Sequence, residues 1–107
     1  MITYEVNLTI ENEIFEDYYN WLVVHAKKML QYDGFKSAVI AKEKITEDSN
    51  QTKITARYDL DSEDSLNNYL TNYATAMRDD GIKRFGNKFI ATRRILLEPL
   101  TLSEDIQ

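Results

Sequence analysis

The sequence predicts a single α+β domain with the element order β-α-β-β-α-β. Residues 2–10 and 53–60 alternate between apolar and polar side chains, as strands with one buried face do. Two longer stretches, around residues 13–32 and 63–79, carry apolar side chains at helical spacing. The chain has 107 residues, which is the length of one ordinary domain.

The first half of the chain predicts a strand, a helix and a second strand. In the strand at residues 2–10, the even-numbered side chains share one apolar face. The helix that follows has an apolar stripe containing Tyr18, Trp21 and His25, and Gly34 ends it, because glycine tolerates the left-handed backbone of a helix end. The second strand covers residues 35–45 and is apolar on both faces at residues 38–41.

The second half predicts a strand, a helix and a final strand. Residues 53–60 form the third strand, and a helix follows whose apolar stripe runs from Leu66 to Met77. Asp80 and Gly81 are expected to end this helix, with a short non-helical segment at 82–86. The last strand covers residues 88–98. We therefore expect a domain at residues 1–99 and a C-terminal tail or short arm at residues 100–107.

Two β-α-β units that share one sheet give a ferredoxin-like arrangement, a four-stranded antiparallel sheet with two helices on one face. The odd-numbered residues of the first and third strands then lie on the uncovered face. Glu5 and Arg57 share that face on adjacent strands, so we expect a cross-strand ion pair. A structural role for this pair is favoured over an acid–base role.

Composition excludes several classes of function. The net charge of −5 and the pI near 4.8 argue against sequence-independent nucleic-acid binding, and the uncovered face lacks the aromatic residues that stack RNA bases. No cysteine is present and only one histidine, so we expect no metal site and no cofactor. No apolar stretch approaches the roughly 20 residues that span a bilayer, and no signal peptide is visible, so we expect a cytoplasmic protein without membrane contacts.

The apolar residues of the edge strands predict a homodimer. The strands at 35–45 and 88–98 carry apolar side chains on both faces, which is typical of strands buried on both sides. A two-layer monomer has nothing to cover the second face, whereas a second copy packed sheet to sheet would cover it and enclose a polar cavity. The alternative is a monomer with a solvated face.

Four arginines and two further side chains are candidates for chemistry. His25 is the only histidine; it is either a general base or a partly buried structural ring, and the structural reading is favoured. The basic segment 78–94 predicts a site for a small anion, against the alternative that its charges are solvated. Arg93 shares a strand face with apolar residues, so it should meet Glu5, an acid of a partner chain or a ligand. The expected ligand-binding residues are Arg57, Arg78, Arg84 and Arg93, and the catalytic candidates are His25 and Glu5.

Several segments resemble a bacterial family of unknown function. These are residues 2–8, the stretch from Tyr18 to His25, residues 34–38, and the later stretches 69–70, 77–81, 84–86 and 93–96. The family belongs to the dimeric α+β barrel superfamily, which includes monooxygenases, lyase-like enzymes and proteins without known activity. The resemblance implies the fold and the dimer, but no reaction. The favoured function is a homodimer that binds a small anionic molecule; the alternative is a cofactor-independent enzyme with His25 or Glu5 as base.

Overall fold

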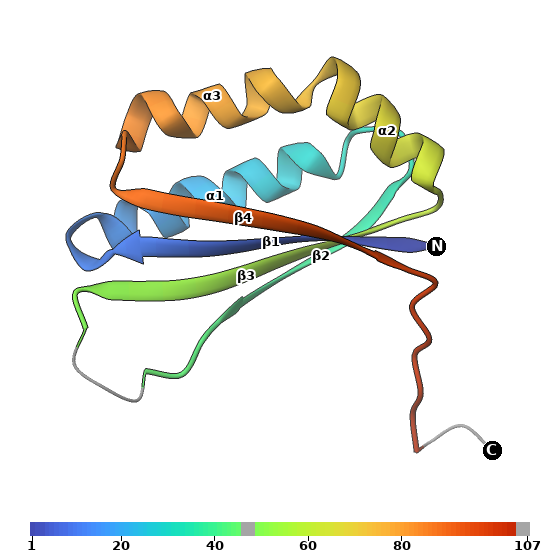
Figure 1. The fold of residues 1–107 in the computed structure, drawn as a ribbon, viewed down its shortest axis with the longest axis horizontal. Helices are drawn as coiled ribbons and strands as arrows, with labels where there is room; N and C mark the ends of the chain where they lie inside the picture. The colour runs from blue at the N-terminus through green and yellow to red at the C-terminus, as the bar shows by residue number, and fades with distance from the viewer. Residues whose placement is uncertain (46–48, 105–107) are drawn as a thin grey trace.

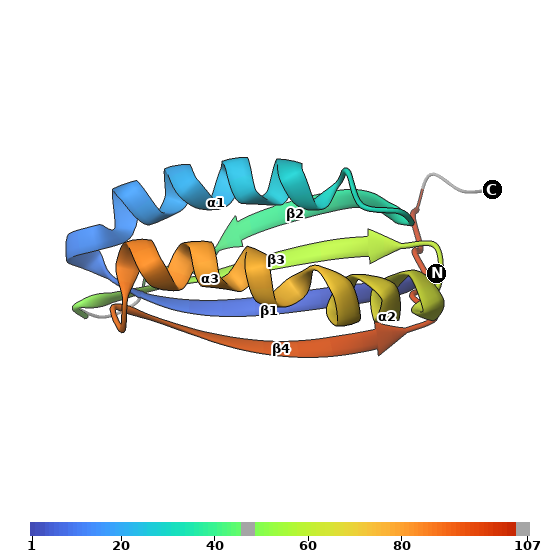
Figure 2. The ribbon, with the colours of Figure 1, turned by 90° about the horizontal axis from the view of Figure 1, so that it is seen from above.

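A computed structural model describes residues 1–45 and 49–104 and confirms the predicted α+β class (Figure 1). The elements are, in order, β1 (Ile2–Glu11), the 3₁₀ helix η1 (Asn12–Ile14), α1 (Phe15–Met29), β2 (Phe35–Lys42), β3 (Gln51–Leu60), α2 (Glu63–Asn72), α3 (Ala74–Phe85) and β4 (Phe89–Leu97). The four strands form one antiparallel sheet in the order β2-β3-β1-β4. All the helices cover the same face of it (Figure 2). The predicted polar turn at 47–50 lies partly outside the described residues.

Strand register decides which side chains face the helices. Tyr4 of β1 lies opposite Tyr58 of β3 and Ile95 of β4. The even-numbered side chains of β1 and β3 form the floor of the core; Tyr4, Leu8 and Tyr58 are almost fully buried there. Their odd-numbered neighbours lie on the uncovered face, as the alternation predicted.

The second helical segment differs from the prediction. It consists of two helices, α2 and α3, separated at Tyr73, and α3 continues through Asp80 and Gly81 to Phe85. The expectation that Gly81 ends the helix is therefore wrong. Gly81 has a physical role in packing, because a Cβ atom there would lie 2.8 Å from Cη2 of Trp21 on α1. The residue that follows the helix end is Gly86, whose φ of +60° favours glycine.

Apolar side chains remain uncovered on the face away from the helices. Val39 of β2 is 60% exposed and Ile90 of β4 is 61% exposed. After β4 the chain turns at Glu98 and runs away from the sheet on this same side (Figure 1). The described residues contain no helix that is both long and apolar enough to cross a membrane.

Candidate ligand-binding cavity

A cavity of about 270 Å³ lies between the two main helices, α1 and α3, and the sheet. This volume is at the lower end of the range for small-molecule sites. Aromatic rings form much of its wall; they belong to Tyr4, Tyr18, Trp21, Tyr58, Tyr69 and Phe89. The charged or titratable nitrogen groups of the lining are His25, Arg78 and Arg93, and no Asp or Glu among the described residues lines it. The cavity therefore has an apolar body and a positive electrostatic bias.

Local structure explains why these three side chains converge. His25 lies one helical turn after Trp21, so the two side chains lie on the same side of α1 and both line the cavity. Arg78 points down from α3. Arg93 lies opposite Val6 of β1, which places it on the helix-covered face of β4. The predicted cavity lay between two sheets, whereas this cavity lies within one chain.

The two arginines are held differently. The Nη2 atom of Arg78 donates a hydrogen bond to the Tyr4 hydroxyl, at 3.0 Å. Arg93 has no carboxylate within ion-pair distance among residues 1–45 and 49–104. Glu5, one of the partners considered for Arg93, lies on the opposite face of the sheet. Arg93 and Ile82 line the cavity and are exposed, so the cavity opens to solvent between α3 and β4.

His25 is held as a neutral ring. Its imidazole stacks on Trp21 with the ring centres 4.6 Å apart and the planes 25° from parallel. Burial lowers the pKa of His25 to about 4, and the nearby charges of Lys28 and Arg93 act in the same direction, against Asp80. At neutral pH the ring is therefore uncharged.

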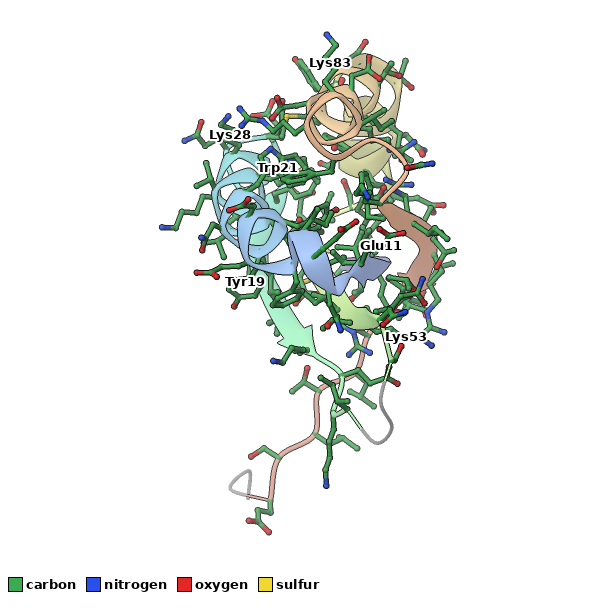
Figure 3. All side chains as sticks on the ribbon, turned by 90° about the vertical axis from the view of Figure 1, so that its left-hand side faces the viewer. Glu11, Tyr19, Trp21, Lys28, Lys53 and Lys83 are labelled. Atoms are coloured by element: carbon green, nitrogen blue, oxygen red, sulfur yellow. The ribbon has the colours of Figure 1, made fainter. Side chains whose placement is uncertain are left out.

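Trp21 separates the cavity from a second groove on the outer surface between α1 and α3. Figure 3 shows Trp21 between the two helices, whereas Lys28 and Lys83 point outward. The indole Nε1 donates a hydrogen bond to Oδ2 of Asp80, at 2.8 Å. This bond lowers the pKa of the Asp80 carboxyl and fixes the orientation of the ring. The sequence identified Trp21 as core, and nothing in the helical spacing marked it as a cavity wall.

The tyrosine hydroxyls complete the polar lining. Burial raises the pKa of Tyr18, Tyr58 and Tyr69, so these phenols remain protonated across the physiological range. A protonated phenol donates one hydrogen bond and accepts others. Sequence reasoning assigned Tyr18 and Tyr69 to the core and did not single out Tyr4 or Tyr58. The sequence contained one sign of this polar lining: tyrosines occupy core-facing positions on both central strands, β1 and β3.

The remaining candidates lie outside the cavity. Glu5 is 2% exposed on the open face, where Oε2 accepts from Nε of Arg57 at 2.8 Å and Oε1 accepts from Nε of Arg94 at 2.6 Å. The predicted Glu5–Arg57 pair is therefore present, but Arg94 was missed. Arg84 lies outside in the groove between the helices and pairs with Asp80 at 3.3 Å. Across the described ranges, no three His, Asp or Glu side chains gather as a metal site would require.

Comparison with known proteins supports the fold. A putative antibiotic biosynthesis monooxygenase from Deinococcus radiodurans has a TM-score of 0.69 at 14% identity, covering 96% of this chain and 99% of its own. A variant of SnoaB, a cofactor-independent oxygenase from Streptomyces nogalater, has a TM-score of 0.67 at 13% identity, covering 96% and 98%. The heme-degrader MhuD from Mycobacterium tuberculosis, solved with two hemes in its active site, has a TM-score of 0.64 at 9% identity, covering 94% and 99%.

At such low identity these likenesses concern the fold alone. No curated protein sequence matches the chain. A family model does match, and it covers residues 1–99, nearly the whole length. The chain therefore belongs to the family described as "Domain of unknown function (DUF4286)".

Proposed function

We propose that this protein is a homodimer that binds a small organic anion in the cavity between its helices and its sheet. The observation that carries the proposal is Arg93, which faces an aromatic-walled cavity without a carboxylate partner among the described residues. Arg93 is exposed where the cavity opens to solvent, so its guanidinium is accessible to an anion that enters. A carboxylate or phosphate matches the fork of guanidinium donors geometrically.

The rest of the cavity lining suits the apolar part of such a ligand. Trp21, Tyr18 and Phe89 present ring faces and edges that pack against an apolar or aromatic body. Arg78 is the second cation, but it already donates to Tyr4. We therefore assign Arg93 to direct contact with the anionic group, and Arg78 to orienting the Tyr4 hydroxyl and adding positive potential.

Thermal-shift measurement with matched ligands tests this proposal. Benzoate and phenylphosphate are compared with benzamide, which has a similar ring and no charge. A ligand that binds only the folded state raises the melting temperature, and at about 100 times the Kd the gain is about 2.7 kcal/mol, or several degrees. We expect at least one acid to stabilise the protein and benzamide to have no effect.

Substitutions of single arginines show which residues are needed for the acid-induced rise in melting temperature. Arg93→Gln should remove the acid-induced shift, and Arg78→Gln should reduce it. Arg84→Gln is the matched control, because Arg84 lies outside the cavity and its loss should leave the shift unchanged. If benzamide stabilises as well as benzoate, or if Arg84→Gln removes the shift as Arg93→Gln does, the anion-binding proposal is wrong.

A second candidate function is proton-transfer catalysis without a cofactor, and the position of the His25 ring in the same cavity, stacked on Trp21, favours it. In this function the imidazole takes a proton from an acidic C–H or O–H bond of the substrate. The electron pair remains on the substrate, as an enolate or phenolate beside Arg93. The fold likeness to SnoaB, a cofactor-independent oxygenase, is compatible with this candidate.

His25→Gln separates the two candidates. Binding of an acid should change little, because the cation that meets the ligand remains. Exchange of deuterium from solvent into an acidic carbon of a bound 1,3-dicarbonyl compound should fall by at least tenfold, since glutamine cannot take the proton. Exchange that persists in His25→Gln would exclude this histidine as the base.

A further inference from the structure

Three tyrosines form one end of the cavity between the helices and the sheet. Tyr4 of β1, Tyr58 of β3 and Tyr69 of α2 all line it, and we call them the tyrosine cluster. The centre of the Tyr4 ring lies 6.2 Å from that of Tyr58 and 6.4 Å from that of Tyr69. Each of the three residues is almost fully buried. Helix α2, which carries Tyr69, lies over the end of the sheet where β1 begins (Figure 2).

Two hydroxyls of this cluster, those of Tyr58 and Tyr69, make no hydrogen bond to any of the described residues. Among those same residues, every side-chain nitrogen or oxygen that is completely enclosed does have a hydrogen-bond partner. The two hydroxyl oxygens are therefore not enclosed by protein, and the open space that both residues line is the cavity. Because a polar group on so buried a side chain is unfavourable without a hydrogen bond, a molecule in the cavity is needed to supply one.

The polar groups of this end are mainly hydrogen-bond donors. Burial raises the pKa of Tyr58 and of Tyr69, so both phenols keep the proton that they can donate. The Tyr4 oxygen accepts from Nη2 of Arg78, which leaves the Tyr4 proton for another acceptor. Apart from the phenol oxygens, the described lining offers one side-chain nitrogen or oxygen that can accept, on the neutral His25 ring. A molecule that satisfies the tyrosine cluster therefore brings an acceptor.

The tyrosine cluster and Arg93 lie on opposite sides of the cavity. Arg93 of β4 pairs with Val6, two residues along β1 from Tyr4, and Tyr58 belongs to β3 on the other side of β1. Two strand spacings across the sheet and two residues along it separate the backbones of Arg93 and Tyr58 by roughly 12 Å. Both side chains extend into the cavity from these positions. One aromatic ring with a polar substituent on each side fits between their polar groups.

We propose that the ligand of this cavity is an aromatic acid with a second polar group, a carbonyl oxygen, which the tyrosine cluster binds while Arg93 meets the acid group. This inference rests on the proposed anion-binding function and names the class of ligand that the cavity selects. A simple aromatic acid satisfies Arg93 alone. A keto-substituted aromatic acid also gives the hydroxyls of Tyr58 and Tyr69 the acceptor that the described chain does not supply.

Isothermal titration calorimetry with matched ligands tests this inference. The acetylbenzoates substituted at position 3 and at position 4 are compared with the corresponding isopropylbenzoates, which have almost the same shape and no oxygen in the substituent. We expect the better acetylbenzoate to bind about tenfold or more tightly than its isopropyl counterpart, because the latter leaves the buried donors unpaired. Equal affinities within both pairs would overturn the inference.

Removal of single hydroxyls shows whether the tyrosine cluster makes this distinction. Tyr58→Phe and Tyr69→Phe keep the rings, and each should lower the ratio of acetyl to isopropyl affinity by about threefold or more. A ratio measured within one variant cancels any general change in the packing of the cavity. Tyr32→Phe is the matched control, because the Tyr32 ring lies 5.2 Å from that of Tyr69 but does not line the cavity. An unchanged ratio in both cluster variants, or an equal fall in the control, contradicts the assignment.

Benzoate, titrated in the same way, separates this inference from the proposed function. If benzoate binds in a manner that Arg93→Gln abolishes, and the acetyl group adds no affinity, the inference fails and the anion site stands. If neither benzoate nor any of the four substituted acids binds, the anion site itself is contradicted, and the inference with it.

Discussion

Glu5 is the only buried carboxylate among the described residues, and it connects three strands. Its two oxygens accept from Arg57 on β3 and Arg94 on β4, and Asn7 donates to Oε1 at 3.0 Å. Both arginine side chains are more than half exposed, so solvent screens their charge. The hydrogen bond from Arg94 is the main reason that the pKa of Glu5 lies at about 2 instead of its ordinary 4.5.

Glu5→Gln should therefore destabilise the fold by about 1–3 kcal/mol at pH 7, since a buried charged hydrogen-bond acceptor is lost. Because the folded-state pKa is lowered, the advantage of the wild type is complete above about pH 4.5 and declines as the pH falls toward 2. Urea unfolding at pH 7, 4 and 3 measures this. Arg57→Gln is the control and should cost less, because Arg94 still holds the carboxylate. A difference in unfolding free energy between the wild type and Glu5→Gln that stays the same at all three pH values would contradict the lowered pKa of Glu5.

The single histidine gives an isolated NMR signal. We expect the imidazole protons of His25 to titrate with a pKa near 4 in the folded protein and near 6.5 in urea. Since burial disfavours the charged ring, stability from this group is complete above about pH 6.5 and falls between pH 6.5 and 4. A folded-state pKa near 6.5 would mean that the ring is solvated, and would contradict its assignment as a cavity wall.

Strand parity determined how much of the site could be predicted. The alternation in β1 and β3 correctly placed Glu5 and Arg57 on the same face of the sheet. The alternation in β4 placed Arg93 on the same face as apolar residues of that strand. It could not show which face those residues meet, because that depends on the pairing of Val6 with Arg93. Arg94, the neighbour with the opposite parity, reaches Glu5 instead. Distances between helix and sheet depend on packing, so the cavity itself could not be inferred.

At the scale of elements, the contact of α1 with α3 depends on one glycine. Gly81 lies in the middle of α3, where alanine is the better helix former by about 1 kcal/mol. A Cβ at this position would nevertheless lie 2.8 Å from Cη2 of Trp21. Trp21 cannot easily move, because it is hydrogen-bonded to Asp80 and stacked on His25.

Gly81→Ala should therefore destabilise the protein by about 1–2 kcal/mol despite the better helix propensity. The control is a double-mutant cycle with Trp21→Phe, whose smaller ring lacks the clashing atom. In that background, Gly81→Ala should be neutral or stabilising. Urea unfolding of the four proteins measures the coupling energy. Additive changes in unfolding free energy would show that the residue at position 81 and the Trp21 ring do not interact.

The same glycine shows where pattern reading failed. The Asp80–Gly81 dipeptide has the composition of a helix end, and local propensity favours a stop there. Packing against Trp21 makes the glycine useful inside the helix, and the chain continues to Gly86, whose positive φ does require glycine. The strands, whose two-residue period is set by burial, were predicted within a few residues at every boundary.

At the scale of the molecule, the open sheet face should control assembly. If a partner covers Val39 and Ile90, the melting temperature should rise with protein concentration. Val39→Lys/Ile90→Lys should abolish that dependence, because four lysines would oppose one another in a dimer. Val24→Lys, on the outer side of α1, is the matched control and should preserve it. Differential scanning fluorimetry across a hundredfold concentration range makes the comparison.

The central position of β1 has a consequence for synthesis on the ribosome. Ile2 pairs with Leu60 and with Leu97, so the first strand to emerge is the one that must wait for both of its neighbours. β4 begins about 80 residues after β1 ends. At roughly 5–20 residues per second, that wait is roughly 4–16 s. The edge of β1 that pairs with β4 therefore stays unpaired during this wait, and the four-stranded sheet is complete only once β4 has emerged.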